Sequence, residues 1–169
     1  HYDGDLPARS GMGSSSSFTV GLLHALYALK GQMSSKQQLA MESIHIEQDL
    51  INETVGSQDQ FVAAYGGLNH ISFGEDSSIT VKPLTLSANR ICELNDHLML
   101  FYTGIVRTAS DIADTYVHDI ASRERQLHSM RRMVTDGISI LNAPHTVGGA
   151  SCEEQCLCKQ GLTCTAMGE

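Results

Sequence analysis

Residues 7–17 read Pro7-Ala8-Arg9-Ser10-Gly11-Met12-Gly13-Ser14-Ser15-Ser16-Ser17, and they lead directly into an apolar segment, Phe18 to Leu29. That segment has no polar face, which predicts a buried helix. Glycines let the main chain approach a ligand closely, and a helix start offers unpaired N–H groups to an anion. The stretch therefore predicts a phosphate-binding loop. Its composition equally allows a flexible linker, but a linker is not expected to run straight into a buried helix.

A second helix is predicted from Ser35 to Asn52, and one acidic residue breaks its amphipathic pattern. Glu47 falls in the middle of an apolar arc made by Leu39, Ala40, Ile44, Ile46, Leu50 and Ile51. An unpaired carboxylate in such a place costs several kcal/mol. A buried arginine, a cleft edge wet enough to solvate the acid, or a Mg²⁺ ion would each resolve the conflict.

A short helix is predicted from Gln58 to Tyr65, with Asp59 in its first turn. An acid at this position is often no more than a helix-start residue stabilised by the helix dipole. It is also a candidate general base for a substrate hydroxyl. Phosphoryl transfer needs a phosphate cradle, a metal and a positioned acid, and the sequence offers one candidate for each, in chain order.

The remaining pattern mixes helices and strands without regular alternation. Strands are predicted at Leu68–Phe73, Ile79–Val81 and Leu98–Tyr102. A long amphipathic helix is predicted from Asp111 to Leu141, and Asn142-Ala143-Pro144 ends it. Helices outnumber strands, which predicts an α+β fold rather than a doubly wound parallel sheet.

Charge and hydropathy exclude some functions. The chain of 169 residues has a formal net charge of −8 and no basic stripe, which argues against nucleic acid as the main partner. No apolar run reaches about 18 residues, so no membrane span is expected. The first residues, His1 to Asp5, lack an initiator Met and a basic segment. We therefore expect that these residues are no signal peptide and that the sequence starts within a longer protein.

The cysteines divide the chain into a body and a tail. Cys92 is the only cysteine of the body, which favours a reduced, cytoplasmic domain. The tail carries Cys152, Cys156, Cys158 and Cys164. Their spacing allows a metal knuckle, a disulfide cluster or no site at all, and a non-homologous end without a selected site is the preferred interpretation.

The loop and the acidic segments together resemble the GHMP kinases, the superfamily of galactokinase, homoserine kinase and mevalonate kinase. Residues 7–16 resemble the family's second motif, Pro-x3-Gly-Leu-Gly-Ser-Ser-Ala, with Met12 in place of Leu and Ser16 in place of Ala. The likeness covers residues 3 to 142 and is strongest to heptose 7-phosphate kinases. The stretches that carry it are 5–11, 44–49, 55–60, 65–69 and 100–110.

The resemblance implies a role for each matching residue. The loop residues Gly11, Gly13, Ser14, Ser15 and Ser16 would bind the phosphates of ATP. Ser15 and Glu47 would hold Mg²⁺, and Asp59 would accept the proton of a sugar hydroxyl. Thr103, Gly104 and Arg107 would touch the substrate, although a surface ion pair is the more ordinary role for an arginine at position 107.

The resemblance also implies an incomplete enzyme. Residues 1–107 would be part of the family's N-terminal domain, which has the ribosomal protein S5 domain 2-like fold, 108–143 the start of its C-terminal domain, and 144–169 the tail. The family's first and third motifs are not found, so we expect this fragment to be inactive alone. Alternatives are a non-catalytic relic that binds a nucleotide or sugar, a kinase for fucose or galactose, and an interaction protein that pairs through its long helix.

Overall fold

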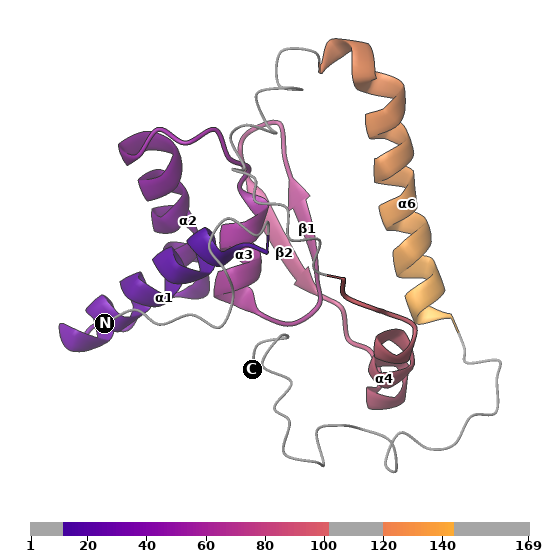
Figure 1. Ribbon diagram of the computed structural model, residues 1–169, viewed down its shortest axis with the longest axis horizontal. Coiled ribbons are helices and arrows are strands. Elements are labelled where there is room, and N and C mark those ends of the chain that lie inside the picture. Colours follow the sequence, from indigo (N-terminus) through magenta and orange to yellow (C-terminus); the bar gives the residue numbers. More distant parts are fainter. Residues whose placement is uncertain (1–11, 102–119, 144–169) are drawn as a thin grey trace. The chain divides into compact units, whose positions relative to one another are not determined.

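The computed structural model describes residues 12–101 and 120–143. The chain divides into two compact units, and their described parts are 12–83 for the first and 84–101 with 120–143 for the second. Figure 1 labels the helices and strands of both units. Within the described residues no helix is both long and apolar enough to cross a membrane.

Three α-helices and one π-helical turn open the first unit (Figure 1). Their bounds are α1 Ser14–Leu29, α2 Lys36–Ile44, the π-helix His45–Leu50, and α3 Gln58–Tyr65. Ser35 caps α2 by accepting a hydrogen bond from the backbone N–H of Gln38 at 3.1 Å, which satisfies one of the unpaired donors of a helix start. The predicted bounds of α3 are confirmed.

A β-hairpin completes the first unit. Strands β1 (Asn69–Phe73) and β2 (Ile79–Pro83) pair antiparallel, with Asn69 opposite Pro83 and Phe73 opposite Ile79. The turn is closed by a hydrogen bond from the N–H of Gly74 to the carbonyl of Ser78 at 2.8 Å. Both strands were predicted from the sequence; β1 starts one residue later than expected and β2 ends two residues later.

The core of the first unit lies where α2 and α3 meet the hairpin. Ala40, Ile44 and Phe61 are its buried members. Partly buried side chains pack around them, namely Ala64, Tyr65, Ile71, Ile79 and Val81. The ammonium of Lys36 donates to the carbonyl of Tyr65 at 2.7 Å, which ties the start of α2 to the end of α3. These contacts fix α3, and with it the acidic residue in its first turn.

A polar contact joins α1 to α2. The hydroxyl of Tyr27 donates to the carboxylate of Glu42 at 2.7 Å, and the side-chain amide of Gln38 donates to both. The bond from Tyr27 holds the pKa of Glu42 below its ordinary value, and the bond to Glu42 raises the pKa of Tyr27. This contact sets how α1 lies on α2.

The prediction that α1 is buried on all sides is wrong. Only Ser16 and Val20 of this helix are buried, whereas the apolar side chains of the outer face are exposed, namely Phe18, Leu22, Leu26 and Leu29. Within the described residues α1 packs against α2 and α3, and its buried members, Ser16 and Val20, stand one helical turn apart on the same face. The apolar side chains of the outer face are not covered by α2 or α3.

The predicted second helix, Ser35 to Asn52, is interrupted by the π-helix. The N–H of Ile51 bonds the carbonyl of Ile46 at 2.9 Å, five residues back, so each residue turns the chain through a smaller angle than in an α-helix. Leu50 and Ile51 therefore leave the predicted apolar arc and are exposed. Asn52 ends the segment with a positive φ of 57°, a conformation that asparagine tolerates better than most residues.

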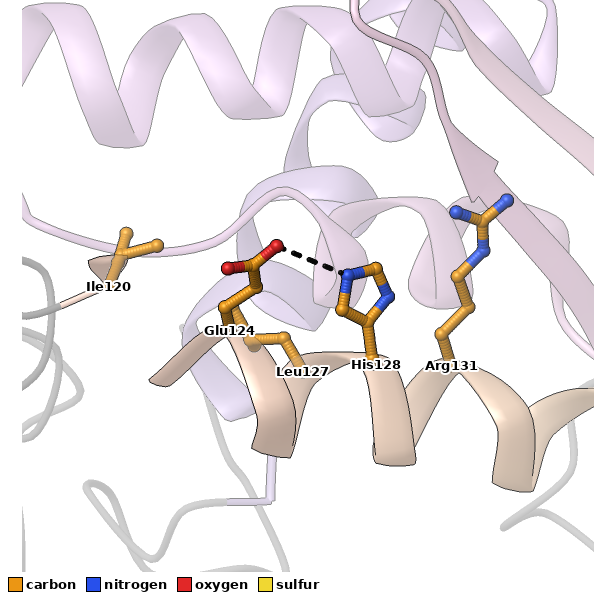
Figure 2. A pocket seen from close by; sticks show the side chains of 5 residues that line it. All are labelled: Ile120, Glu124, Leu127, His128 and Arg131. Atoms are coloured by element: carbon orange, nitrogen blue, oxygen red, sulfur yellow. Dashed lines mark ion pairs between the residues drawn. The ribbon is translucent and has the colours of Figure 1, made fainter. Parts of the chain in front are cut away.

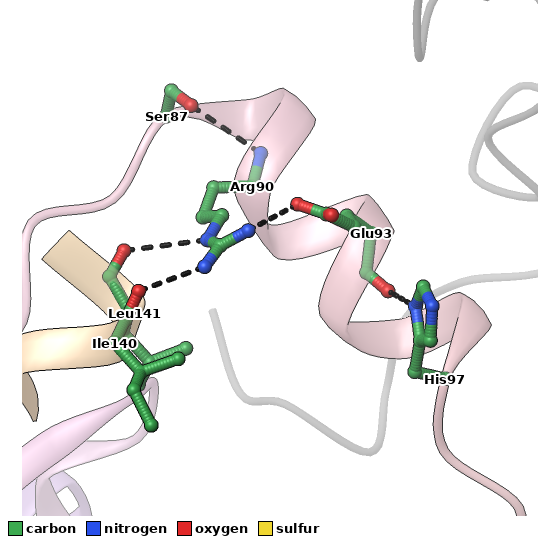
Figure 3. Close-up of polar contacts among 6 residues, drawn as sticks. All are labelled: Ser87, Arg90, Glu93, His97, Ile140 and Leu141. Atoms are coloured by element: carbon green, nitrogen blue, oxygen red, sulfur yellow. Dashed lines mark hydrogen bonds and ion pairs between the residues drawn. The ribbon is translucent and has the colours of Figure 1, made fainter. Parts of the chain in front are cut away.

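The second unit consists of α4 (Ala88–Asp96), a 3₁₀ turn (Ala121–Arg123) and α6 (Glu124–Asn142). Ser87 caps α4 by accepting a hydrogen bond from the N–H of Arg90 at 3.3 Å. The guanidinium of Arg90 donates to the carbonyls of Ile140 at 2.8 Å and Leu141 at 3.3 Å and pairs with Glu93 (Figure 3). Arg90 thereby satisfies carbonyls that the last turn of α6 leaves unpaired.

Three expectations for the second unit are wrong. The described part of the strand predicted at Leu98–Tyr102 forms no strand. The long predicted helix is not continuous, because α6 begins only after the 3₁₀ turn at Ala121–Arg123, where Ser122 is a weak helix former. Cys92 is disulfide-bonded rather than reduced. The long helix was predicted to end at Leu141, and α6 ends one residue later, at Asn142.

Candidate active site

The start of α1 is built to receive an anion. Gly13 precedes the helix in the left-handed conformation, with φ 69° and ψ 20°, and makes no side-chain cap. The N–H groups of the first turn therefore have no acceptor within the helix. These donors and the positive end of the helix dipole favour a phosphate group.

Glu47 lies buried beside the same helix start. Its side chain is 2% exposed. Its Oε2 accepts a hydrogen bond from the hydroxyl of Ser16 at 3.1 Å and another from the side-chain amide of Gln60 at 2.6 Å. Its Oε1 is buried and has no hydrogen-bond partner. The π-helix thus delivers this carboxylate to the first turn of α1, as its place in the apolar arc of the sequence suggested.

Asp59 also lies close to the glycine turn. A Cβ placed on Gly13 would lie 3.7 Å from Oδ2 of Asp59, so the absence of a side chain there leaves the carboxylate against bare main chain. The side-chain amide of Gln48 donates to the carbonyl of Val55 at 2.9 Å and to the hydroxyl of Ser57 at 3.3 Å. These bonds fix the turn that leads into α3, and hence the start of the helix that carries Asp59.

The two acids therefore converge on one feature, the glycine turn and the first turn of α1. Glu47 reaches it through Ser16, and Asp59 reaches it through Gly13. Asp59 is exposed and Glu47 is buried. A base that must meet a substrate needs access, whereas a metal ligand benefits from a dry, fixed position, so the two environments suit different tasks.

The remaining predicted site residues divide into two groups. Ser14 and Ser15 stand in the first turn of α1, and Ser15 is exposed. The structure brings the hydroxyl of Ser16, and not that of Ser15, to Glu47. Gly11, Thr103, Gly104 and Arg107 lie outside the described residues, as do the four cysteines of the tail.

The oxygen donors of this site fit a hard divalent cation. Within the described residues no cationic side chain pairs with Glu47, and a buried carboxylate without a cation is costly. The unpartnered Oε1 is an available ligand atom, and the exposed Ser15 directly precedes Ser16, which donates to the same carboxylate. No cluster of three His, Cys, Asp or Glu occurs among residues 12–101 and 120–143. This pattern suits Mg²⁺, which binds through one or two carboxylates, water and substrate phosphates.

Sequence reasoning missed Gln60 as a member of this site. The residue follows Asp59 directly, is 1% exposed and donates to Glu47. A glutamine in the first turn of a short helix carries no signal in its local pattern.

A separate pocket lies on the second unit and contains none of the predicted site residues. It has a volume of about 440 Å³ and is lined by Ile120, Glu124, Leu127, His128 and Arg131. Figure 2 shows its polar side chains along one side of α6, where His128 and Glu124 form a pair at 3.5 Å. Both partners are largely exposed, so the pair is worth little, and the pocket offers no buried polar group to a ligand.

The left-handed conformation of Gly13 leads to a stability prediction. Gly13→Ala is expected to lower the free energy of unfolding by about 1–2 kcal/mol, because a Cβ is strained at positive φ. Gly21→Ala is the matched control. Gly21 lies inside α1 with nothing within 4 Å of an added Cβ, so that change should stabilise by about 0.5–1 kcal/mol. Urea denaturation measures both, and an unchanged midpoint for Gly13→Ala would contradict the left-handed turn.

Comparison with known proteins identifies the relatives of this site. The family described as GHMP kinases N terminal domain matches residues 1–67. The D-glycero-alpha-D-manno-heptose 7-phosphate kinase of Campylobacter jejuni is 29% identical over 143 residues, which are 85% of this chain and 42% of that protein. The bifunctional fucokinase/GDP-fucose pyrophosphorylase of Arabidopsis thaliana is 28% identical over 134 residues, 78% of this chain and 13% of that protein.

A solved structure shares the fold. The crystal structure of a D-glycero-D-manno-heptose 1-phosphate kinase from Bacteroides thetaiotaomicron superposes with a TM-score of 0.52 and 31% identity, over 53% of this chain and 29% of that one. This chain thus spans less than half the length of each of these proteins. The matched family covers the loop, Glu47 and Asp59. Residues 1–67 therefore match the GHMP kinase N-terminal domain family, and the chain is similar to part of several sugar kinases.

Proposed function

We propose that this chain is part of an ATP- and Mg²⁺-dependent kinase that transfers the γ-phosphoryl group of ATP to a hydroxyl of a sugar or sugar phosphate. The observation that carries the proposal is the convergence of Glu47 and Asp59 on the start of α1. Positioning and electrostatics supply most of the rate enhancement in phosphoryl transfer. A phosphate cradle flanked by two acids in different environments supports that chemistry.

The loop residues bind the phosphates in this proposal. The N–H groups that open α1, at Ser14 and Ser15, donate to phosphate oxygens, and Gly13 leaves room for their approach. Gly11 belongs to the same loop by its place in the sequence motif. Ser16 has its hydroxyl on Glu47, so its contribution to phosphate binding comes from the backbone. Glu47 and Ser15 hold the Mg²⁺, which neutralises charge on the transferring phosphoryl group.

Asp59 is the proposed general base. Its carboxylate accepts the proton of the sugar hydroxyl while that oxygen bonds to the γ-phosphorus, and the bond from the γ-phosphorus to the bridging oxygen of ADP breaks. The exposure of Asp59 leaves it open to a substrate. Thr103, Gly104 and Arg107 remain proposed substrate contacts from the sequence resemblance alone.

A heptose 7-phosphate is the proposed acceptor, phosphorylated at its anomeric hydroxyl. Support comes from two relatives whose names state a heptose phosphate kinase. The similarity to a protein with fucokinase activity in its name makes fucose the second candidate. A cytoplasmic location is proposed with the function, because the proposed reaction uses ATP as the phosphoryl donor.

An ATP-consumption screen tests the proposal. The complete kinase that carries this segment is assayed with heptose 7-phosphate, fucose, galactose and mannose, with and without Mg²⁺. We expect Mg²⁺-dependent ATP consumption with heptose 7-phosphate and at least tenfold less with the three unphosphorylated sugars. A preference for fucose would change the proposed substrate but leave the proposed reaction unchanged. ATP consumption with none of the four would contradict the proposed acceptor class.

A further inference from the structure

The carboxylate of Glu47 is held asymmetrically. Both of its hydrogen bonds, from Ser16 and Gln60, go to Oε2. Its other oxygen, Oε1, is equally buried and has no partner. A carboxylate can rotate about its last bond and exchange its two oxygens. Two donors on one oxygen prevent that rotation and leave a defined oxygen free.

Of the two donors, the amide of Gln60 makes the shorter bond. It lies 2.6 Å from Oε2, compared with 3.1 Å for the hydroxyl of Ser16. Ser16 also stands where the GHMP motif has alanine, so its hydroxyl adds to an arrangement that the motif does not require. Gln60 is therefore the main support of the carboxylate.

Gln60 is buried with one polar atom paired and the other unpaired. The residue is 1% exposed, and its own Oε1 has no hydrogen-bond partner. A buried polar atom without a partner costs free energy, and such atoms in a folded protein call for a functional reason. An apolar residue at position 60 would avoid that cost, but it would leave Oε2 of Glu47 with one donor fewer.

We propose that Gln60 is a positioning residue for the cation site: its amide holds Oε2 of Glu47 so that Oε1 points to the metal. The inference rests on the proposed function, because it requires Glu47 to bind the cation. Partners that orient a metal ligand in this way matter nearly as much as the ligands themselves. Because Asp59 precedes Gln60 on α3, the same helix then fixes both the base and the metal ligand.

Binding of Mn²⁺ to the 169-residue chain tests the inference without any assay of activity. Paramagnetic broadening of the backbone amide NMR signals near Glu47 reports site-specific affinity even when binding is weak. Gln60→Met keeps the length of the side chain and removes the donor, and we expect it to weaken Mn²⁺ binding about 10- to 100-fold. Gln60→Asn keeps the polarity but withdraws the amide from Glu47, and should lose affinity to the same extent.

Three further variants separate positioning from folding. Ser43→Ala removes a buried hydroxyl that has no partner and should leave Mn²⁺ affinity unchanged within about twofold. Val20→Ala truncates a buried side chain of α1, one helical turn after Ser16, and should lower the urea midpoint while keeping the affinity. Ser16→Ala should weaken binding by about threefold at most. An equal loss of affinity in Val20→Ala and Gln60→Met would mean that Gln60 acts through stability, which overturns the inference.

Glu47→Gln distinguishes failure of this inference from failure of the proposed function. If Glu47→Gln abolishes the broadening and the Gln60 variants retain wild-type affinity, the cation site stands and Gln60 has no positioning role. If the wild-type chain shows no broadening near Glu47, or if Glu47→Gln leaves it unchanged, the cation site itself is wrong and the inference falls with it.

Discussion

Asp59→Asn is expected to lower kcat by about 10²–10⁴-fold in the complete kinase that carries this segment, because an amide cannot accept the hydroxyl proton. The affinity for ATP should change little, since the loop and Glu47 hold the nucleotide in the proposed site. Steady-state kinetics gives kcat, and a binding titration with ATP gives the affinity. The structure supports a loss of kcat without a loss of ATP affinity, because Asp59 lies beside the glycine turn but is exposed to an incoming acceptor.

Asp49→Asn is the matched control for this substitution. Asp49 lies on the π-helix, two residues after Glu47, and its exposed carboxylate pairs with His45 at 2.7 Å. The same chemical change there removes an exposed ion pair of small value, so kcat should stay within about twofold of wild type. Near-normal turnover of Asp59→Asn would remove the general base from the mechanism, whereas equal losses in both variants would point to a general effect of charge.

Local patterns in the sequence were enough to predict most elements of the first unit. The helix at Gln58–Tyr65 lies between Gly56 and the pair Gly66-Gly67, so its ends are marked by residues that interrupt helices. The strands of the hairpin are marked in the same way by the turn between them. In the second unit, α4 was missed, although Ser87 is a good cap and Ile91 and Leu94 have helical spacing. The helix is short, and its apolar positions are too few to stand out.

Predictions that assumed one regular geometry over a long segment were less accurate. The helical wheel from Ser35 to Asn52 applied a constant rotation per residue, and it placed Glu47 on the buried face correctly. Beyond that point the π-helix changes the rotation, and Leu50 and Ile51 turn outward. A π-helix is held by backbone hydrogen bonds between residues five apart and has no strong sequence signature, so this error could not have been avoided from the pattern alone.

The site was predictable where a residue conflicted with its surroundings and not where it agreed with them. Glu47 drew attention because an acid interrupts an apolar arc, and Gly13 because two glycines precede a helix. Gln60 breaks no hydropathy pattern in the sequence. Its proposed importance comes from a hydrogen bond to a residue 13 positions away. Contacts of this kind depend on how α3 packs on the π-helix, which only the folded structure shows.

Phe61→Ala is expected to lower the free energy of unfolding of the first unit by about 3–5 kcal/mol. The ring is 0% exposed, stacks on Tyr65 with centroids 5.8 Å apart, and packs with Ala40 and Ile44 in a core of few buried side chains. Small domains are stable by only about 5–15 kcal/mol, so the variant should be close to unfolding at room temperature. Urea denaturation followed by far-ultraviolet circular dichroism measures the loss.

Val62→Ala, one residue further along α3, is the matched control. Its side chain is 44% exposed, so truncation should cost less than about 1 kcal/mol. Phe61→Leu keeps most of the buried volume and should fall between the two. Because Phe61 follows Gln60, a cavity beneath it would also loosen the amide that holds Glu47, and Mn²⁺ binding should weaken in Phe61→Leu before the fold is lost. A cost below about 1 kcal/mol for Phe61→Ala would mean that α3 is not anchored by this ring, and the fixed placement of Asp59 and Gln60 would lose its physical basis.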